Sequence, residues 1–112
     1  MNYSEIDEFT KEFKKLRKKY PSLDEDFRNV KEIIRCYPKG RGEKHWNLLK
    51  KKESVFVYKI RVRCRSLRST EIRIIYQFVE IVNKVNFIEI YYKGDKSNED
   101  RKRYERIFNE SI

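Results

Sequence analysis

Basic and apolar residues alternate strictly along residues 58–65 of this chain. Successive side chains of a β-strand point to opposite faces, so this alternation predicts a strand with one basic face and one apolar face. The basic face carries Lys59, Arg61, Arg63 and Arg65, and the apolar face carries Tyr58, Ile60, Val62 and Cys64. A row of like charges is repulsive. We therefore expect the basic face to meet an anion such as a phosphate backbone, or to stay in solvent as the charged surface of an edge strand.

Length and charge narrow the class of protein. With 112 residues and 38% hydrophobic content, the chain is expected to form a single domain over residues 1–112. The formal net charge of +10 indicates a partner that is nucleic acid, an acidic protein or anionic lipid. No apolar run reaches membrane-spanning length and the N-terminus lacks a signal pattern, so we expect a soluble cytoplasmic protein without a membrane partner.

The two cysteines and the connector give weaker signals. Cys36 and Cys64 are far apart and lack metal-ligand spacing, which predicts two reduced, mostly buried thiols and neither a metal site nor a disulfide framework. His45 is expected to be a loop residue and not a catalyst, because it has no evident carboxylate partner. Trp46 either seals the edge of the helix hairpin or lies exposed against a partner.

Two amphipathic helices are predicted before Pro38, because apolar residues recur there at offsets of three and four. The first stripe is Ile6, Phe9, Phe13, Leu16 and Tyr20, and the second is Leu23, Phe27, Val30, Ile33 or Ile34, and Tyr37. Pro21 ends the first helix. The spacing of Ser22 and Glu25 predicts a capping box at the start of the second. The very short turn between them makes the pair an antiparallel hairpin.

Three strands and a last helix follow a long basic connector over residues 38–54. Residues 55–63, 71–80 and 84–92 are rich in β-branched and aromatic residues and predict an antiparallel meander. In this meander Arg73 can share a sheet face with Lys59 and Arg61. The last helix is expected to begin at Ser97 or Asn98. The predicted fold is α+β: an N-terminal helix hairpin on a small twisted antiparallel sheet of three to four strands, with a C-terminal helix.

Several short strings, taken in order, resemble the RelE/ParE superfamily of bacterial and archaeal type II toxins. They are residues 9–16 (FTKEFKKL), 20–26 (YPSLDED), 58–61 (YKIR), 72–76 (IRIIY) and 88–93 (IEIYYK). The resemblance implies a helix hairpin on a twisted sheet, often with an extra N-terminal strand, for which residues 1–4 would serve. It also implies a cognate antitoxin, and the ribosome with its mRNA, as partners.

The resemblance further implies a metal-free endoribonuclease without a cofactor, whose catalytic residues would be Lys59, Arg61, Arg73, Lys93 and Tyr104. Charge on the phosphorane would be stabilised by Arg61 and Arg73, and Lys59 would transfer a proton. Further RNA contacts would come from Arg63, Arg65, Arg68 and Lys96.

Two other functions remain open at this point. A ParE-like toxin would bind DNA gyrase and need no phosphate chemistry. A catalytically decayed member would hold RNA or an antitoxin without turnover, and this alternative is favoured by the absence of a histidine near the end of the chain.

Overall fold

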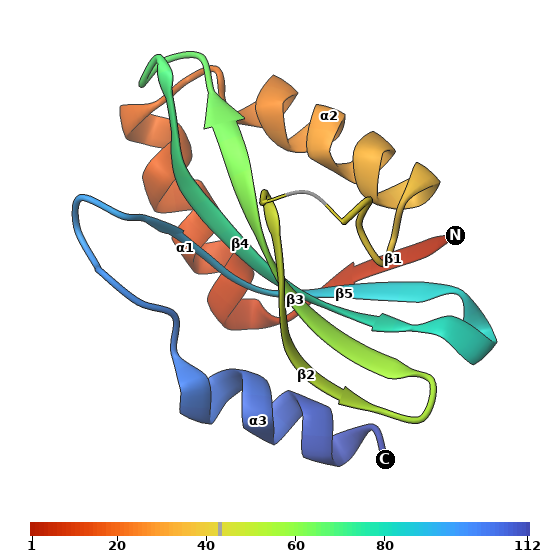
Figure 1. The fold of residues 1–112 in the computed structure, drawn as a ribbon. Helices are drawn as coiled ribbons and strands as arrows, with labels where there is room; N and C mark the ends of the chain where they lie inside the picture. Colours follow the sequence, from red (N-terminus) through yellow and green to blue (C-terminus); the bar gives the residue numbers. More distant parts are fainter. Residues whose placement is uncertain (43) are drawn as a thin grey trace.

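The computed structural model describes residues 1–42 and 44–112 and has three helices and five strands within them (Figure 1). In chain order they are β1 (Asn2–Glu5), α1 (Asp7–Lys19), α2 (Leu23–Cys36), β2 (Trp46–Lys52), β3 (Val55–Cys64), β4 (Ser69–Val79), β5 (Lys84–Tyr92) and α3 (Arg101–Glu110), with a 3-10 turn η1 (Glu80–Val82) before β5. The predicted α+β order of helix hairpin, sheet and C-terminal helix is confirmed.

The sheet is larger than predicted and is not wholly antiparallel. Its strand order is β1-β5-β4-β3-β2, with β1 parallel to β5. The extra N-terminal strand expected over residues 1–4 is present. The fifth strand, β2, lies inside the segment predicted to be a connector. A register shift between Leu48 and Lys50 interrupts its alternation, and the period-two signal of a strand is therefore missing from its sequence.

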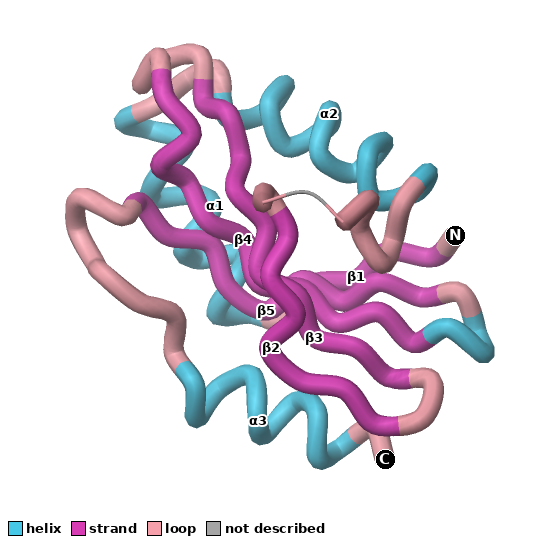
Figure 2. The backbone as a smooth tube through the Cα atoms, viewed as in Figure 1, coloured by secondary structure: helices cyan, strands magenta, loops and turns pink. Residues whose placement is uncertain are grey.

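The sheet lies between α1 and α2 on one side and α3 on the other (Figure 2), and an apolar layer covers each of its faces. Helices α1 and α2 cover one face, where Ile72, Ile74, Tyr76 and Phe78 of β4 are buried as the predicted alternation requires. On the other face α3 packs Tyr104, Ile107 and Phe108 against residues of β3, β4 and β5. Because α3 covers only part of this face, the other part is left for the polar side chains described below.

The start of α2 differs from the predicted capping box. Ser22 has helical backbone angles (φ −67°, ψ −12°) and makes no side-chain cap. Its hydroxyl donates to Asp26 at 2.6 Å and accepts from the backbone N–H of Ser66 at 2.8 Å. The prediction was wrong because this hydroxyl binds the turn between β3 and β4, which the local sequence does not reveal.

Two other local predictions also need correction. Helix α3 begins at Arg101, with the Asp100 carboxylate accepting from the Arg103 N–H at 3.1 Å, so neither Ser97 nor Asn98 is its cap. Cys64 is buried as expected, but Cys36 is exposed at the end of α2. Cys36 lies outside the apolar stripe by which α2 packs on the sheet, so its side chain faces solvent.

Trp46 seals the edge of the core beside the chain that leaves α2. Its indole N–H donates to the Tyr76 hydroxyl at 3.1 Å, and that hydroxyl donates to the Pro38 carbonyl at 2.8 Å. Gly40 lies against the indole with φ +74°. Of the two positions considered for Trp46, the structure has the packed one.

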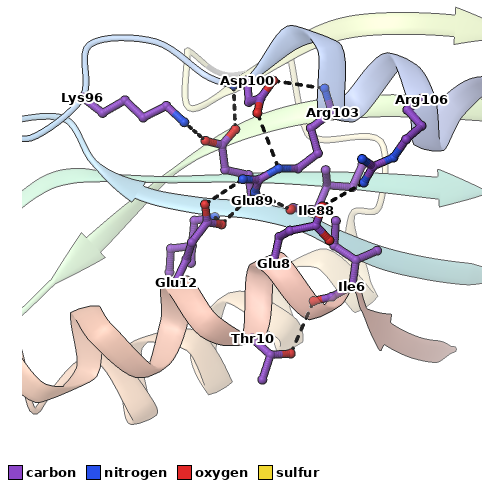
Figure 3. A network of polar contacts seen from close by, with 11 residues as sticks. Ile6, Glu8, Thr10, Glu12, Ile88, Glu89, Lys96, Asp100, Arg103 and Arg106 are labelled. Carbon is purple, nitrogen blue, oxygen red and sulfur yellow. Dashed lines mark hydrogen bonds and ion pairs between the residues drawn. The ribbon is translucent and has the colours of Figure 1, made fainter.

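A network of ion pairs fastens α3 and the chain before it to α1 and β5 (Figure 3). The Arg103 guanidinium donates to both Glu12 carboxylate oxygens, at 2.9 and 3.0 Å, and to the Ile88 carbonyl at 3.1 Å. The buried Glu89 carboxylate accepts from the backbone N–H of Asp100 at 2.8 Å and pairs with Lys96. Burial opposes the charge of Arg103, but the hydrogen bonds and charge of Glu12 raise its pKa overall. These contacts fix the course of residues 93–100.

Gly40→Ala is predicted to destabilise the fold more than Gly42→Ala. Both glycines have φ +74°, so both substitutions cost about 1–2 kcal/mol of left-handed strain. An added Cβ at Gly40 would lie 2.7 Å from the Trp46 ring, whereas one at Gly42 meets nothing within 4 Å. We expect a further loss of about 1–3 kcal/mol for Gly40→Ala alone. Urea unfolding followed by Trp46 fluorescence measures both, and equal losses would contradict this packing.

Glu12→Gln is predicted to cost about 1–3 kcal/mol of unfolding free energy, because it leaves the largely buried Arg103 guanidinium without its bidentate partner. Glu8→Gln is the matched control. It breaks the Glu8–Arg106 pair, which joins the same two helices but is half exposed, and should cost less than about 1 kcal/mol. Urea is the appropriate denaturant because it does not screen charge. Similar losses in the two variants would mean that the Arg103 contact does not hold α3.

Candidate functional site

The sheet register places two arginines directly opposite each other. Arg61 of β3 pairs with Arg73 of β4, and Arg73 pairs in turn with Tyr91 of β5. Paired residues of antiparallel strands point to the same face, so all three side chains lie on the face that carries α3. Lys59 lies two residues from Arg61 and shares this face, as predicted.

These side chains line a hollow of about 290 Å³ beside α3. Its lining residues are Lys44, His45, Trp46, Asn47, Lys59, Arg61, Arg73, Tyr91, Lys93, Ser97 and Asn98. They come from the chain entering β2, from strands β2, β3, β4 and β5, and from the loop that the Glu89 contacts hold. Four of the five residues predicted to be catalytic, namely Lys59, Arg61, Arg73 and Lys93, meet here.

Arg73 is the most deeply placed cation of the hollow, with 7% of its surface exposed. Its guanidinium donates to the backbone carbonyls of Thr70 and Ile72. Burial lowers the pKa of Arg73, and the neighbouring charge of Arg61 lowers it further. Within residues 1–42 and 44–112, no carboxylate lies within 4.0 Å of either guanidinium. Among the described residues, two positive charges without an ion-pair partner therefore face the same small space.

Lys59 has a partner that sequence reasoning did not identify. Its ammonium donates to the Glu99 carboxylate at 2.7 Å, and both side chains are mostly buried, with 22% and 16% exposed. This ion pair links β3 to the loop before α3. It also places one negative charge at the rim of an otherwise cationic hollow.

Tyr91 is the second residue that sequence reasoning missed. Its ring is almost fully buried at the wall of the hollow. Burial, with smaller effects of Glu99 and Glu89, raises the pKa of Tyr91 to about 12, so its hydroxyl keeps its proton near neutral pH. The pairing of Arg73 with Tyr91 would have identified this residue. The sequence does not predict that pairing, because the register of β4 and β5 shifts between Ile75 and Tyr76.

The remaining predicted residues lie outside the hollow. Arg63 and Arg65 line a separate groove of about 460 Å³ between α2 and the end of β3. Arg65 does not share the basic face, because β3 ends at Cys64 and the Arg65 guanidinium bonds to Asp26 of α2 at 3.1 Å. Arg68 lies in the turn before β4 with φ 54°.

Two residues predicted from the C-terminal segment have structural partners. Lys96 pairs with the buried Glu89 carboxylate and lies over the Tyr91 ring, outside the lining of the hollow. Tyr104 is buried in the core beneath α3, 8% exposed, and does not line the hollow. His45 is a loop residue as expected, but it lies in the wall of the hollow. No helix in the described part of the chain is long and apolar enough to cross a membrane.

Comparison with known proteins relates this chain to solved structures by its fold. No family model and no curated protein matches the sequence. The structure is similar to a chain of the crystal structure of an archaeal RelE-RelB complex from Pyrococcus horikoshii OT3, with a TM-score of 0.62 and 15% sequence identity. The match covers 83% of this chain and 94% of that chain. At this identity the likeness is one of fold, and this chain has a RelE-like fold.

Proposed function

We propose that this protein is the toxin of a type II toxin-antitoxin system and that it cleaves mRNA on the ribosome without a metal ion. The observation that carries the proposal is the pair of opposed arginines, Arg61 and Arg73, in a hollow open to a ligand. Like charges directly opposite each other weaken a sheet. A bound phosphodiester would relieve that repulsion.

The hollow supplies the cations that metal-free RNA cleavage requires. The guanidinium groups of Arg61 and Arg73 present forked donors to phosphate oxygens and can stabilise the additional charge of a phosphorane. Lys59, held by Glu99, and Lys93 add positive charge on either side. The net charge of +10 would attract the protein to ribosomal RNA at long range.

The same surface suits inhibition by a partner protein. A cognate antitoxin with an acidic segment could cover the cationic hollow and exclude RNA from it. In this proposal the protein acts in the cytoplasm, and its partners are the antitoxin, the ribosome and mRNA.

Arg61→Ala and Arg73→Ala are each predicted to lower mRNA cleavage at least about 100-fold, because each removes a donor that stabilises the phosphorane. Purified protein, ribosomes and a defined mRNA give the rate by primer extension. Arg28→Ala is the charge-matched control: it removes an exposed arginine of α2 that pairs only with Glu25, and should cleave like the wild type. Growth inhibition is expected to follow cleavage in all three variants.

The Arg61→Ala result has a second readout that separates site from scaffold. Because this change relieves repulsion with Arg73, the free energy of unfolding should stay the same or rise. A toxin that remains fully active in the double variant Arg61→Ala, Arg73→Ala contradicts the proposal and directs attention to a protein target, which a gyrase supercoiling assay would reveal.

Glu99→Gln is predicted to tighten binding of a non-cleavable RNA, because it removes a carboxylate that pairs with Lys59, a cation of the hollow. Loss of a charge–charge repulsion at the rim is worth about 1 kcal/mol, or roughly 3- to 10-fold in affinity. The matched control is Glu105→Gln, which removes a carboxylate that pairs with Lys50 and Arg101 outside the hollow. Fluorescence anisotropy with a 2′-deoxy-substituted oligonucleotide measures both. Equal gains would mean that only net charge matters.

A further inference from the structure

His45 is fixed at the edge of the hollow by its backbone. It directly precedes β2, and its carbonyl accepts from the Arg61 N–H at 2.9 Å. The next residue pair along these strands is Trp46 with Ile60. The ladder therefore continues one step beyond β2 and sets His45 opposite Arg61, on the same face of the sheet. The lining of the hollow contains both side chains.

A single row of side chains now crosses the sheet: His45, Arg61, Arg73 and Tyr91. Neighbouring strands are about 4.8 Å apart, so consecutive members of the row are in reach of one bound group. The two guanidiniums occupy the centre, and an imidazole and a phenol stand at the ends. A phosphate seated on the arginines would have one titratable side chain on each side.

The proposed cleavage needs a group that takes a proton from the attacking 2′-hydroxyl, and the other side chains of the row do not supply it. Guanidinium groups have no acceptor and stay charged. The Tyr91 hydroxyl keeps its proton, and the Lys59 ammonium is paired with Glu99. No carboxylate of the described residues is in the lining of the hollow. An imidazole, in contrast, accepts a proton readily near neutral pH.

The His45 side chain is placed but not engaged. Its neighbour Trp46 is anchored through Tyr76, which holds this part of the chain against the core. In the described ranges 1–42 and 44–112, no hydrogen bond or ion pair occupies the imidazole. The charged groups around it are Lys44, Lys59, Arg61, Arg73 and Lys93 on the side of the hollow and Asp26, Arg41, Arg63 and Arg65 on the side of the groove.

We propose that His45 is a catalytic residue, the proton acceptor of the cleavage reaction; this inference rests on the proposed ribonuclease function. The neutral imidazole takes the proton of the 2′-hydroxyl as its oxygen forms a bond to the adjacent phosphorus. The bond from phosphorus to the 5′ oxygen then breaks, leaving a 2′,3′-cyclic phosphate. The 5′ oxygen takes a proton from water, and the imidazolium returns its proton to solvent. Arg61 and Arg73 hold the phosphate throughout.

His45→Gln tests this role in the ribosome-dependent cleavage assay. Loss of a general base typically lowers the rate 10²- to 10⁴-fold, so we expect kcat to fall by at least about 100-fold with KM within about two-fold. Over pH 5.5 to 8.5 the wild-type rate should rise from the acid side, and His45→Gln should lose that dependence. Added imidazole should restore part of the activity of His45→Ala and none of that of Arg73→Ala.

A second measurement does not depend on turnover. His45 is the only histidine of the chain and gives a single set of imidazole NMR signals. Adding the 2′-deoxy-substituted oligonucleotide should shift these signals in the wild type. The shift should be much smaller in the double variant Arg61→Ala, Arg73→Ala. Unchanged signals on saturation would overturn the inference.

The outcomes separate the two proposals. Suppose that Arg73→Ala is inactive while His45→Gln cleaves like the wild type or differs from it only in KM. This result would support the ribonuclease function and contradict the catalytic role of His45. If the wild type does not cleave mRNA on the ribosome, both are overturned. Trp46 fluorescence and circular dichroism establish that each variant is folded before it is assayed.

Discussion

The direct pairing of Arg61 with Arg73 is the constraint on which the arrangement of the site depends. Two guanidiniums opposite each other oppose sheet formation, and burial of Arg73 adds a desolvation cost. The apolar layers on both faces of β3 and β4 impose this register regardless, because a slip of one residue would move the core side chains of one strand to the opposite face and break the packing of both layers. The hydrophobic core thus holds two like charges opposite each other although their repulsion opposes this arrangement.

Residues far from the hollow decide its shape. Four lining positions, Tyr91, Lys93, Ser97 and Asn98, belong to β5 and the loop after it. The Glu89 carboxylate of β5 accepts a hydrogen bond from the backbone at the end of that loop. The ion pair of Arg103 with Glu12 joins α3 to α1. The same loop carries Glu99 to Lys59. A surface rich in flexible cations becomes a defined site because buried carboxylates fix the irregular segment between β5 and α3.

Sequence reasoning identified the elements with strong periodicity and the basic face of β3, and it predicted that Arg73 can share a sheet face with Arg61, but it did not fix the register that pairs them. It missed β2 because a bulge at Leu48 breaks that strand's alternation. It missed Glu99 and Tyr91, whose positions depend on contacts between distant segments. It gave His45 no role, because the loop sequence does not reveal that the ladder continues past Trp46 to Arg61. Tyr104 fitted the apolar stripe of a helix as well as a catalytic site, and in the structure it is buried in the core.

The pairing of β1 with β5 bears on the order in which the fold assembles. Asn2 lies beside Lys84, so the sheet hydrogen bonds of β1 cannot form until β5 is in place. Contacts of such large sequence separation slow folding. Because β5 and the loop after it also line the hollow, the same strand that β1 needs as its neighbour is needed to complete the hollow. The topology thus makes the hollow depend on long-range pairing and not on any local segment that could form early by itself.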